Sequence, residues 1–253
     1  MNKTVTLNID SRFRKNYYTS ISSDFDIDLH YSLHNIITMK LKNIHLPNSW
    51  HEIKEVYKNN YLYIGADKIT IPDGNYTNVS FKSTFEDLCT AAGLSIWFTL
   101  DMKNGFSKIY DPLGGVIQIT FTEGNDEFCN SLGWMLGYRK KNLTGSSEYY
   151  GSAIFNLNKI NYVYLVVNDF NYDNELIISN LKDSYLAGNI LSIIRVNARS
   201  YDSVNIDTWE SQLRVYPNPV DINKINVKIL DMDGKILNLN GNDLSFSLEF
   251  TLK

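Results

Sequence analysis

Aspartate residues recur at two places in this chain with spacings that could hold a metal ion. Asp24, Asp26 and Asp28 alternate with apolar residues, so a strand would present all three carboxylates on one face as possible Ca²⁺ ligands. The segment 231–234 (D-M-D-G) resembles the start of a calcium loop but lacks the third ligand and the closing Glu. We interpret the first as a solvated sheet face and the second as a hairpin turn. We therefore expect no bound metal and no cofactor.

The histidines and the catalytic motifs give no stronger signal. His30 and His34 have a spacing that suits a metal on a helix, but their segment has the pattern of strand and turn. The sequence contains no zinc-ligand spacing, no G-x-S-x-G, no Walker A motif and no G-x-G-x-x-G. Without a catalytic constellation, we predict that the protein is not an enzyme.

Basic and aromatic residues gather near the N-terminus. Arg12, Arg14 and Lys15 lie beside Tyr17 and Tyr18 in a polar segment that follows the first predicted strand. Arg and Tyr are enriched in the cores of protein interfaces. We predict that these five residues form an interface on an extended arm. The alternative is an ordinary polar loop.

Composition narrows the classes of partner. The net charge is −4 and the pI about 5.6, so nucleic acid is not expected as the primary partner. No run approaches the length of a membrane span and no signal peptide precedes the first strand, which predicts a protein that is intracellular when made. Cys89 and Cys129 lie in segments predicted to be helical, where we expect reduced core thiols.

The elements that must position these residues are mostly strands. Val5, Leu7 and Ile9 alternate in the first strand, and a phase shift near Lys42-Asn43 predicts a β-bulge. Further strands are predicted over 61–64, 68–71, 96–101, 116–122, 162–167 and 190–196. Segments 142–152 and 202–223 are expected to be a loop and a long connection.

The last part of the chain predicts the end of a sheet. Ile225, Val227 and Ile229 share one face, and Asp233-Gly234 predicts a two-residue hairpin turn in which both residues have positive φ. Alternating apolar residues then close the chain from Leu244 onward.

Two short helices interrupt the strands, near residues 78–93 and 125–136. The first has a cap at Thr77 or Asn78, an apolar stripe and a terminating Gly93. Helices do not alternate regularly with strands, so we predict an all-β, antiparallel β-sandwich of jelly-roll type with two inserted helices. We expect one domain over residues 1–253, with an N-terminal strand and arm (1–23) and a sandwich (24–253).

Three stretches in this order resemble one family of virion proteins. They are N-I-D-S-R-F-R-K-N-Y-Y (8–18) with D-F-D-I-D-L and L-P-N after it; I-P-D-G-N-Y-T (71–77) with a later L-G-W-M-L-G-Y (132–138); and D-M-D-G followed by L-S-F-S-L-E-F. The order is similar to that of the penton and minor capsid jelly-roll proteins of nucleocytoplasmic large DNA viruses and related virus-like elements.

The resemblance implies a structural role in a virion capsid after synthesis in the host cytoplasm. The implied partners are further copies in a homopentamer at the vertex, a double jelly-roll major capsid protein and other minor capsid proteins. One alternative is a minor capsid protein under the facets. Another is a carbohydrate-binding module, in which Trp50 and Trp209 would lie in loops while Trp97 and Trp134 would be buried.

Overall fold

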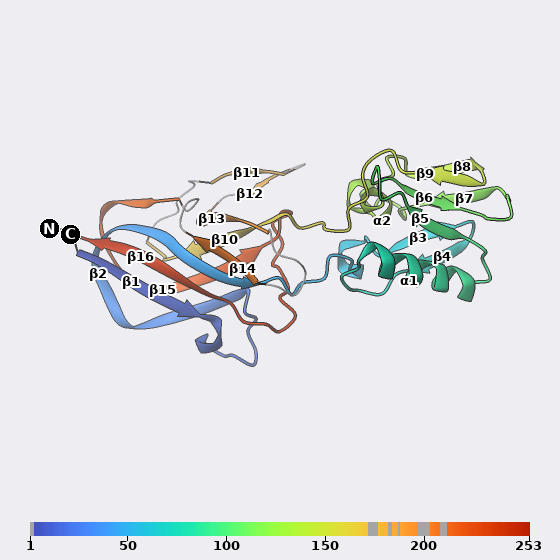
Figure 1. Cartoon of the computed structure of the whole chain (residues 1–253). Coiled ribbons are helices and arrows are strands. Elements are labelled where there is room, and N and C mark those ends of the chain that lie inside the picture. Colours follow the sequence, from blue (N-terminus) through green and yellow to red (C-terminus); the bar gives the residue numbers. More distant parts are fainter. Residues whose placement is uncertain (1–2, 172–176, 182–183, 187, 197–202, 208–211) are drawn as a thin grey trace. The chain divides into compact units, whose positions relative to one another are not determined.

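The computed structural model of the protein describes residues 3–171, 177–181, 184–186, 188–196, 203–207 and 212–253 (Figure 1). The helices are α1 (Asn78–Ala91) and α2 (Leu132–Met135), with 3₁₀ turns η1 (Ser11–Phe13), η2 (Glu55–Tyr57) and η3 (Phe128–Asn130). The strands are β1 (Lys3–Asp10), β2 (Asp24–Pro47), β3 (Tyr61–Ile64), β4 (Asp67–Thr70), β5 (Trp97–Leu100), β6 (Ser107–Tyr110), β7 (Ile117–Thr120), β8 (Asn142–Ser146), β9 (Glu148–Tyr150), β10 (Tyr162–Asn168), β11 (Ser179–Asn180), β12 (Tyr185–Leu186), β13 (Ile190–Arg195), β14 (Ser203–Asp207), β15 (Arg214–Leu230) and β16 (Ser245–Leu252).

The pairings of these strands confirm the predicted fold class. Every strand pair in the described residues is antiparallel. The chain is an all-β protein of jelly-roll type with few helices, as the alternating pattern predicts.

The chain divides into two compact units. Unit 1 comprises Met1–Trp50 and Ile160–Lys253, and unit 2 is the continuous segment His51–Lys159. Each unit has its own buried apolar cluster. The insertion supplies enough strands and apolar side chains to close a core of its own, so it does not have to share that of unit 1.

Unit 1 is built on one large sheet with the strand order β1-β16-β2-β15-β10-β13, and β14 pairs with β2. In Figure 1, β2 is a long strand that bends along its course. The predicted bulge is confirmed, because Ser247 pairs with Asn43 whereas Leu248 pairs with Leu41, which leaves Lys42 as the extra residue.

The expected long connection over 202–223 is wrong. This stretch contains β14 and the start of β15, which pairs with β2. Pro217 and Pro219 lie where the register of this pairing shifts between Val215 and Val220. A proline has no N–H to donate to a neighbouring strand, and such an irregularity tolerates that loss.

The closing segment matches its predicted faces but not its predicted turn. Ile225, Val227 and Ile229 are buried, as the alternation predicts. In the turn only Gly234 has a positive φ, of 78°, so the predicted pair of left-handed residues is wrong at Asp233. The side chain of Asp231 accepts hydrogen bonds from the backbone N–H groups of residues 233 and 235, which stabilises this different turn.

Unit 2 contains a four-stranded sheet, β4-β3-β7-β8, and a three-stranded sheet, β5-β6-β9. Helix α1 begins at the predicted cap: Thr77 and Ser80 form a reciprocal capping box. The helix packs the predicted stripe of Phe81, Phe85 and Cys89 into the core, and it ends before Gly93, whose φ is 75°.

Two expectations for unit 2 are corrected. The stretch 142–152 is not a loop, because β8 pairs with β7 and β9 pairs with β6. The second helix is only the single turn α2, preceded by η3, rather than a helix over 125–136. Ser131 ends η3 and caps α2, which separates the two turns.

Candidate functional site

The arm predicted as an interface is the segment 11–23, which joins β1 to β2. Asp10 caps η1, and the Ser11 hydroxyl, which is buried, donates to Asp243 Oδ1 over 2.6 Å. The backbone N–H of Ser11 also donates to the carbonyl of Leu244. The base of the arm is therefore fixed to the segment that precedes β16, more than two hundred residues later in the chain.

Arg14 holds the arm in shape. Its Nη1 lies 2.6 Å from Asp243 Oδ1, and its other nitrogens donate to Ser20 Oγ and to the backbone carbonyl of Tyr17. Its side chain is only 8% exposed. The Tyr17 ring centroid lies 4.0 Å from this guanidinium, and the Tyr17 hydroxyl lies 3.2 Å from Asp243 Oδ2. Arg14 and Tyr17 thus act as supports of the arm.

The other two basic residues of the arm are paired on its surface. Arg12 is 65% exposed and binds the carboxylate of Asp10 through two of its nitrogens. Hydrogen bonding from Arg12 lowers the pKa of Asp10 below its ordinary value. Lys15 forms an exposed ion pair with Asp28 at 3.0 Å. These pairs reduce the positive charge that the sequence suggests.

The apolar side chains of the arm are its exposed part. Tyr18 is 97% exposed and Phe13 is 81% exposed. Ile21 is also exposed. Phe13 and Ile21 are not among the five residues that the sequence predicts for an interface. Each is an apolar residue within an otherwise polar loop, where no predicted sheet face could bury it. That pattern could have indicated an exposed contact residue.

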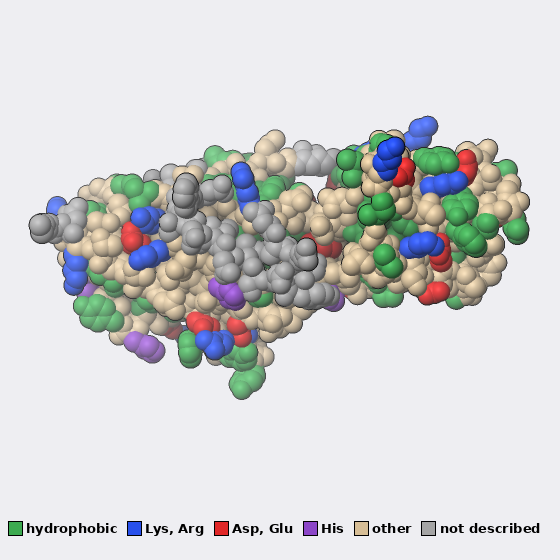
Figure 2. Space-filling view, viewed as in Figure 1, with side chains coloured by type: hydrophobic (Ala, Val, Ile, Leu, Met, Phe, Trp, Pro, Cys, Tyr) green, Lys and Arg blue, Asp and Glu red, His purple; other side chains and the backbone are tan. Residues whose placement is uncertain are grey.

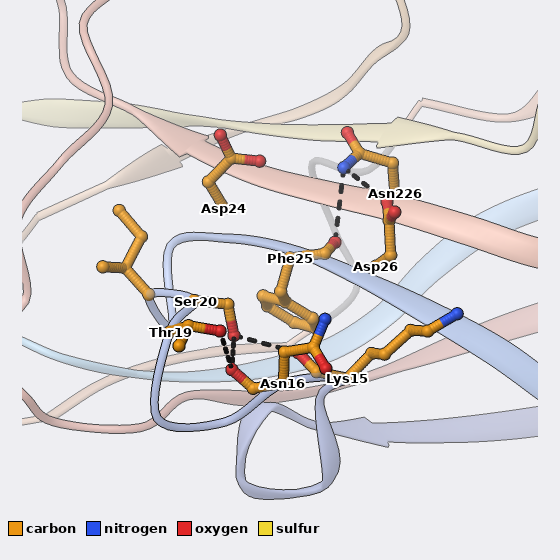
Figure 3. A pocket seen from close by; sticks show the side chains of 9 residues that line it. Lys15, Asn16, Thr19, Ser20, Asp24, Phe25, Asp26 and Asn226 are labelled. Carbon is orange, nitrogen blue, oxygen red and sulfur yellow. Dashed lines mark hydrogen bonds between the residues drawn. The ribbon is translucent and has the colours of Figure 1, made fainter.

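A groove of about 420 Å³ lies between the arm and the sheet. Figure 3 shows Lys15, Asn16, Thr19 and Ser20 of the arm on one side, with residues of β2 and Asn226 of β15 on the other. Asn226 donates to Asp26 and to the backbone carbonyl of Phe25, as the dashed lines in Figure 3 mark.

The row of carboxylates on β2 takes part in ion pairs across strands. Asp26 lies 3.0 Å from Lys224, and the Asp24 carboxylate lies 4.0 Å from Lys228. Hydrogen bonding from Asn226 and then the Lys224 charge lower the pKa of Asp26. Among the described residues, no group of three His, Cys, Asp or Glu is placed to hold a metal ion.

The remaining chemical candidates are dispersed. His34 is exposed and its Nδ1 lies 2.9 Å from Asp221. Cys89 is buried as expected, and burial raises the pKa of its thiol to about 12. Cys129 is exposed, which corrects its expected place in the core, because η3 does not turn it inward.

None of the described helices is long and apolar enough to cross a membrane.

The tryptophans lie opposite to expectation. Trp50 is buried, whereas Trp97 is 48% and Trp134 is 38% exposed. Trp209 lies outside the described residues. The reason is that Trp50 belongs to the core of unit 1, while Trp97 faces outward from a sheet that already buries Phe98 on its other face.

The fold defines a class of protein, an antiparallel jelly-roll chain interrupted between residues 50 and 160 by an inserted unit. Comparison with solved structures finds a particular protein of similar fold. The chain resembles the mavirus penton protein with a TM-score of 0.52 and 13% identity, over 98% of this chain and 99% of that one. The predicted resemblance to penton and minor capsid proteins is thereby confirmed for the fold.

A second similar structure comes from the Sputnik virophage, with a TM-score of 0.48 and 13% identity, over 98% of this chain and 97% of that one. No family model and no curated protein matches the sequence.

Proposed function

We propose that this protein is a structural component of a virion capsid, specifically a vertex protein that forms pentamers beside the major capsid protein of a large DNA virus. The observation that carries the proposal is the shared fold with the mavirus penton protein over nearly the full length of both chains. The match includes the inserted unit, because it covers 98% of this chain. A match to the sandwich alone would fit many jelly-roll proteins.

In this proposal the protein acts by assembly rather than by catalysis. It is made in the host cytoplasm and takes its place in the capsid, where its partners are further copies, the major capsid protein and other minor capsid proteins. A closed ring of five copies needs a heterologous contact, in which one patch of a subunit meets a different patch of the next. The arm is the surface that we assign to such a contact.

The arm suits this role because some of its residues fix its conformation while others are exposed for contact. Arg14 and Tyr17 are tied to Asp243, so the arm is preorganised and loses little conformational freedom on binding. Phe13 and Tyr18 then present apolar surface to the neighbouring subunit. Arg12 and Lys15, paired with carboxylates beside them, belong to a polar rim.

The test is the molar mass of the purified full-length protein, measured by light scattering behind a sizing column. We expect a species of about five times the 29.1 kDa of one chain. If only monomer is seen at all concentrations, purified capsid shells should be searched for the chain. A position under the facets rather than at the vertices would contradict the penton assignment and support a minor capsid protein.

The arm is tested separately by the double variant Phe13→Ser/Tyr18→Ser. We expect it to dissociate the pentamer while each subunit stays folded, because both side chains are exposed in the subunit. The matched control is Tyr31→Ser, since Tyr31 is 79% exposed on β2 outside the arm. Pentamers that persist in the double variant would place the contact elsewhere on the chain.

A further inference from the structure

The outward face of sheet β5-β6-β9 in unit 2 carries an aromatic ring on each of its strands. Trp97 of β5 is 48% exposed and Tyr150 of β9 is 61% exposed, with Tyr110 of β6 between them in strand order. On the opposite face, Phe98 and Ile109 are fully buried. Phe98 and Ile109 therefore supply this sheet's contribution to the core of unit 2, and the outward rings are not part of that core.

The pairing register brings the outward residues into two rows. Trp97 lies opposite Tyr110, which lies opposite Glu148; Thr99 lies opposite Lys108, which lies opposite Tyr150. The Trp97 and Tyr110 rings meet edge to face, with centroids 6.1 Å apart. On the face of unit 2 shown in Figure 2, hydrophobic side chains reach the surface among basic and acidic ones.

An ion pair lies among the rings. Lys108 Nζ is 4.5 Å from the Tyr110 ring centroid and 5.1 Å from that of Tyr150. It also lies 2.5 Å from Glu148 Oε2, while the Tyr150 hydroxyl donates to Glu148 Oε1 over 3.3 Å. Hydrogen bonding within the pair raises the pKa of Lys108 and lowers that of Glu148, so both groups are charged at neutral pH.

The charges and aromatic rings of this face indicate which class of ligand it can bind. The ammonium and the carboxylate neutralise each other, so a strongly charged partner gains no net attraction at this face. A neutral ligand rich in hydroxyl groups complements both, because hydroxyls donate to Glu148 and accept from Lys108. The C–H groups on the face of a pyranose ring carry partial positive charge, which complements the negative face of an aromatic ring.

The composition of this face also argues against a protein partner. The outward strand positions are Trp97, Thr99, Lys108, Tyr110, Glu148 and Tyr150. Charged residues are depleted at the cores of protein interfaces, yet here Lys108 lies between the Tyr110 and Tyr150 rings and is paired with Glu148. We propose that this face of unit 2 binds a neutral oligosaccharide, with Trp97 and Tyr150 stacking on sugar rings and the Lys108–Glu148 pair binding hydroxyls.

This binding activity goes beyond capsid assembly and does not depend on it, because all of its residues lie in unit 2 of a single chain. It would give a shell protein the means to attach to a glycosylated surface. A protein with this face would bind sugar whether it is a monomer or a pentamer. Repetition around a ring would only add avidity.

The experiment uses the full-length protein and three neutral probes, cellohexaose, chitohexaose and mannohexaose, titrated separately while tryptophan fluorescence is recorded. We expect a saturable change with at least one probe, since Trp97 is at the surface. Trp97→Ala and Tyr150→Ala should each weaken the binding of that probe at least about tenfold, measured by calorimetry.

The matched control is Trp134→Ala, because Trp134 is also partly exposed in unit 2 but lies on α2 rather than on a strand of the β5-β6-β9 sheet. We expect this control to bind the probe as the unaltered protein does. Tyr150→Ala separates a loss of binding from a loss of folding. Its ring is mostly exposed, so its removal should leave the melting temperature unchanged.

Three results would overturn the proposal. The first is the absence of saturable binding by all three probes. The second is an equal loss of affinity in Trp97→Ala and Trp134→Ala. The third is a change of oligomeric state in Trp97→Ala and Tyr150→Ala with unchanged sugar affinity, which would make this face a protein interface.

Discussion

The guanidinium of Arg214 lies 2.7 Å from the carboxylate of Asp169, and both side chains are almost completely buried in unit 1. The Tyr216 hydroxyl donates to the same carboxylate, and Arg214 also donates to the backbone carbonyl of Asn189. The carboxylate thus links the start of strand β15 to the segment after β10. Burial raises the pKa of Tyr216 far above its ordinary value, so its hydroxyl keeps the proton that it donates.

Removing one member of this buried pair should be strongly destabilising. Asp169→Ala leaves the Arg214 charge buried without its carboxylate, which costs about 3 to 5 kcal/mol of unfolding free energy. Urea unfolding measures this loss. The control is Asp28→Ala, which removes an exposed pair with Lys15 and should have a much smaller effect on the unfolding free energy, because solvent screens such a pair. Equal losses of unfolding free energy in the two variants would show that the buried pair stabilises the protein no more than the exposed pair does.

The arm should loosen when its anchor is removed. Asp243→Ala deletes the acceptor of Ser11, Arg14 and Tyr17, which should cost about 2 to 3 kcal/mol. Trypsin should then cleave faster after Lys15, and mass spectrometry of the fragments measures the rate. Asp221→Ala, which removes an exposed carboxylate elsewhere in unit 1, should leave that rate unchanged. An unaltered cleavage rate in Asp243→Ala would contradict the anchoring role.

Stability should fall in acid, partly through Asp26. Its pKa is lowered below the ordinary value of 3.8, first by the Asn226 hydrogen bond and then by Lys224. A carboxyl whose pKa is lowered on folding stabilises the protein above the unfolded value, and this contribution is lost as pH falls through the folded value. Unfolding free energies should therefore decline below about pH 4, and less steeply in Asp26→Asn. The same slope in both proteins would be the contrary result.

Close packing at Gly133 should make unit 2 sensitive to a single methyl group. A Cβ at this position would lie 2.2 Å from the Phe121 ring, so Gly133→Ala should cost about 1 to 3 kcal/mol through overpacking. Gly74→Ala is the matched control, since its Cβ would meet only Tyr76 at an ordinary distance of 3.4 Å. Thermal unfolding measures both. A Gly133 variant as stable as the control would mean that Phe121 moves aside at no cost.

Much of the local structure of this chain could be predicted from its sequence. The alternation of Ile225, Val227 and Ile229 predicts a buried strand face, and the cap at Thr77 predicts the start of α1. The phase slip at Lys42 locates the bulge in β2. These predictions hold because side-chain periodicity and capping depend on neighbours within a few residues.

Of the candidate site, the sequence could locate the arm but not the roles of its residues. Arg14 and Tyr18 have similar surroundings in the sequence, yet Arg14 is buried against Asp243 and Tyr18 is almost wholly exposed. Asp243 lies 229 residues from Arg14, so no local pattern reports the contact.

The sequence by itself therefore determined the strand-rich class, the cap of α1, the bulge and the basic, aromatic arm. Only the tertiary structure decided that residues 51–159 form a unit of their own, that Trp50 is buried while Trp97 faces outward, and that β15 continues through Pro217 and Pro219. The physical reason is that burial and strand pairing depend on which distant segments meet. Local periodicity shows which residues share a face but not what covers that face.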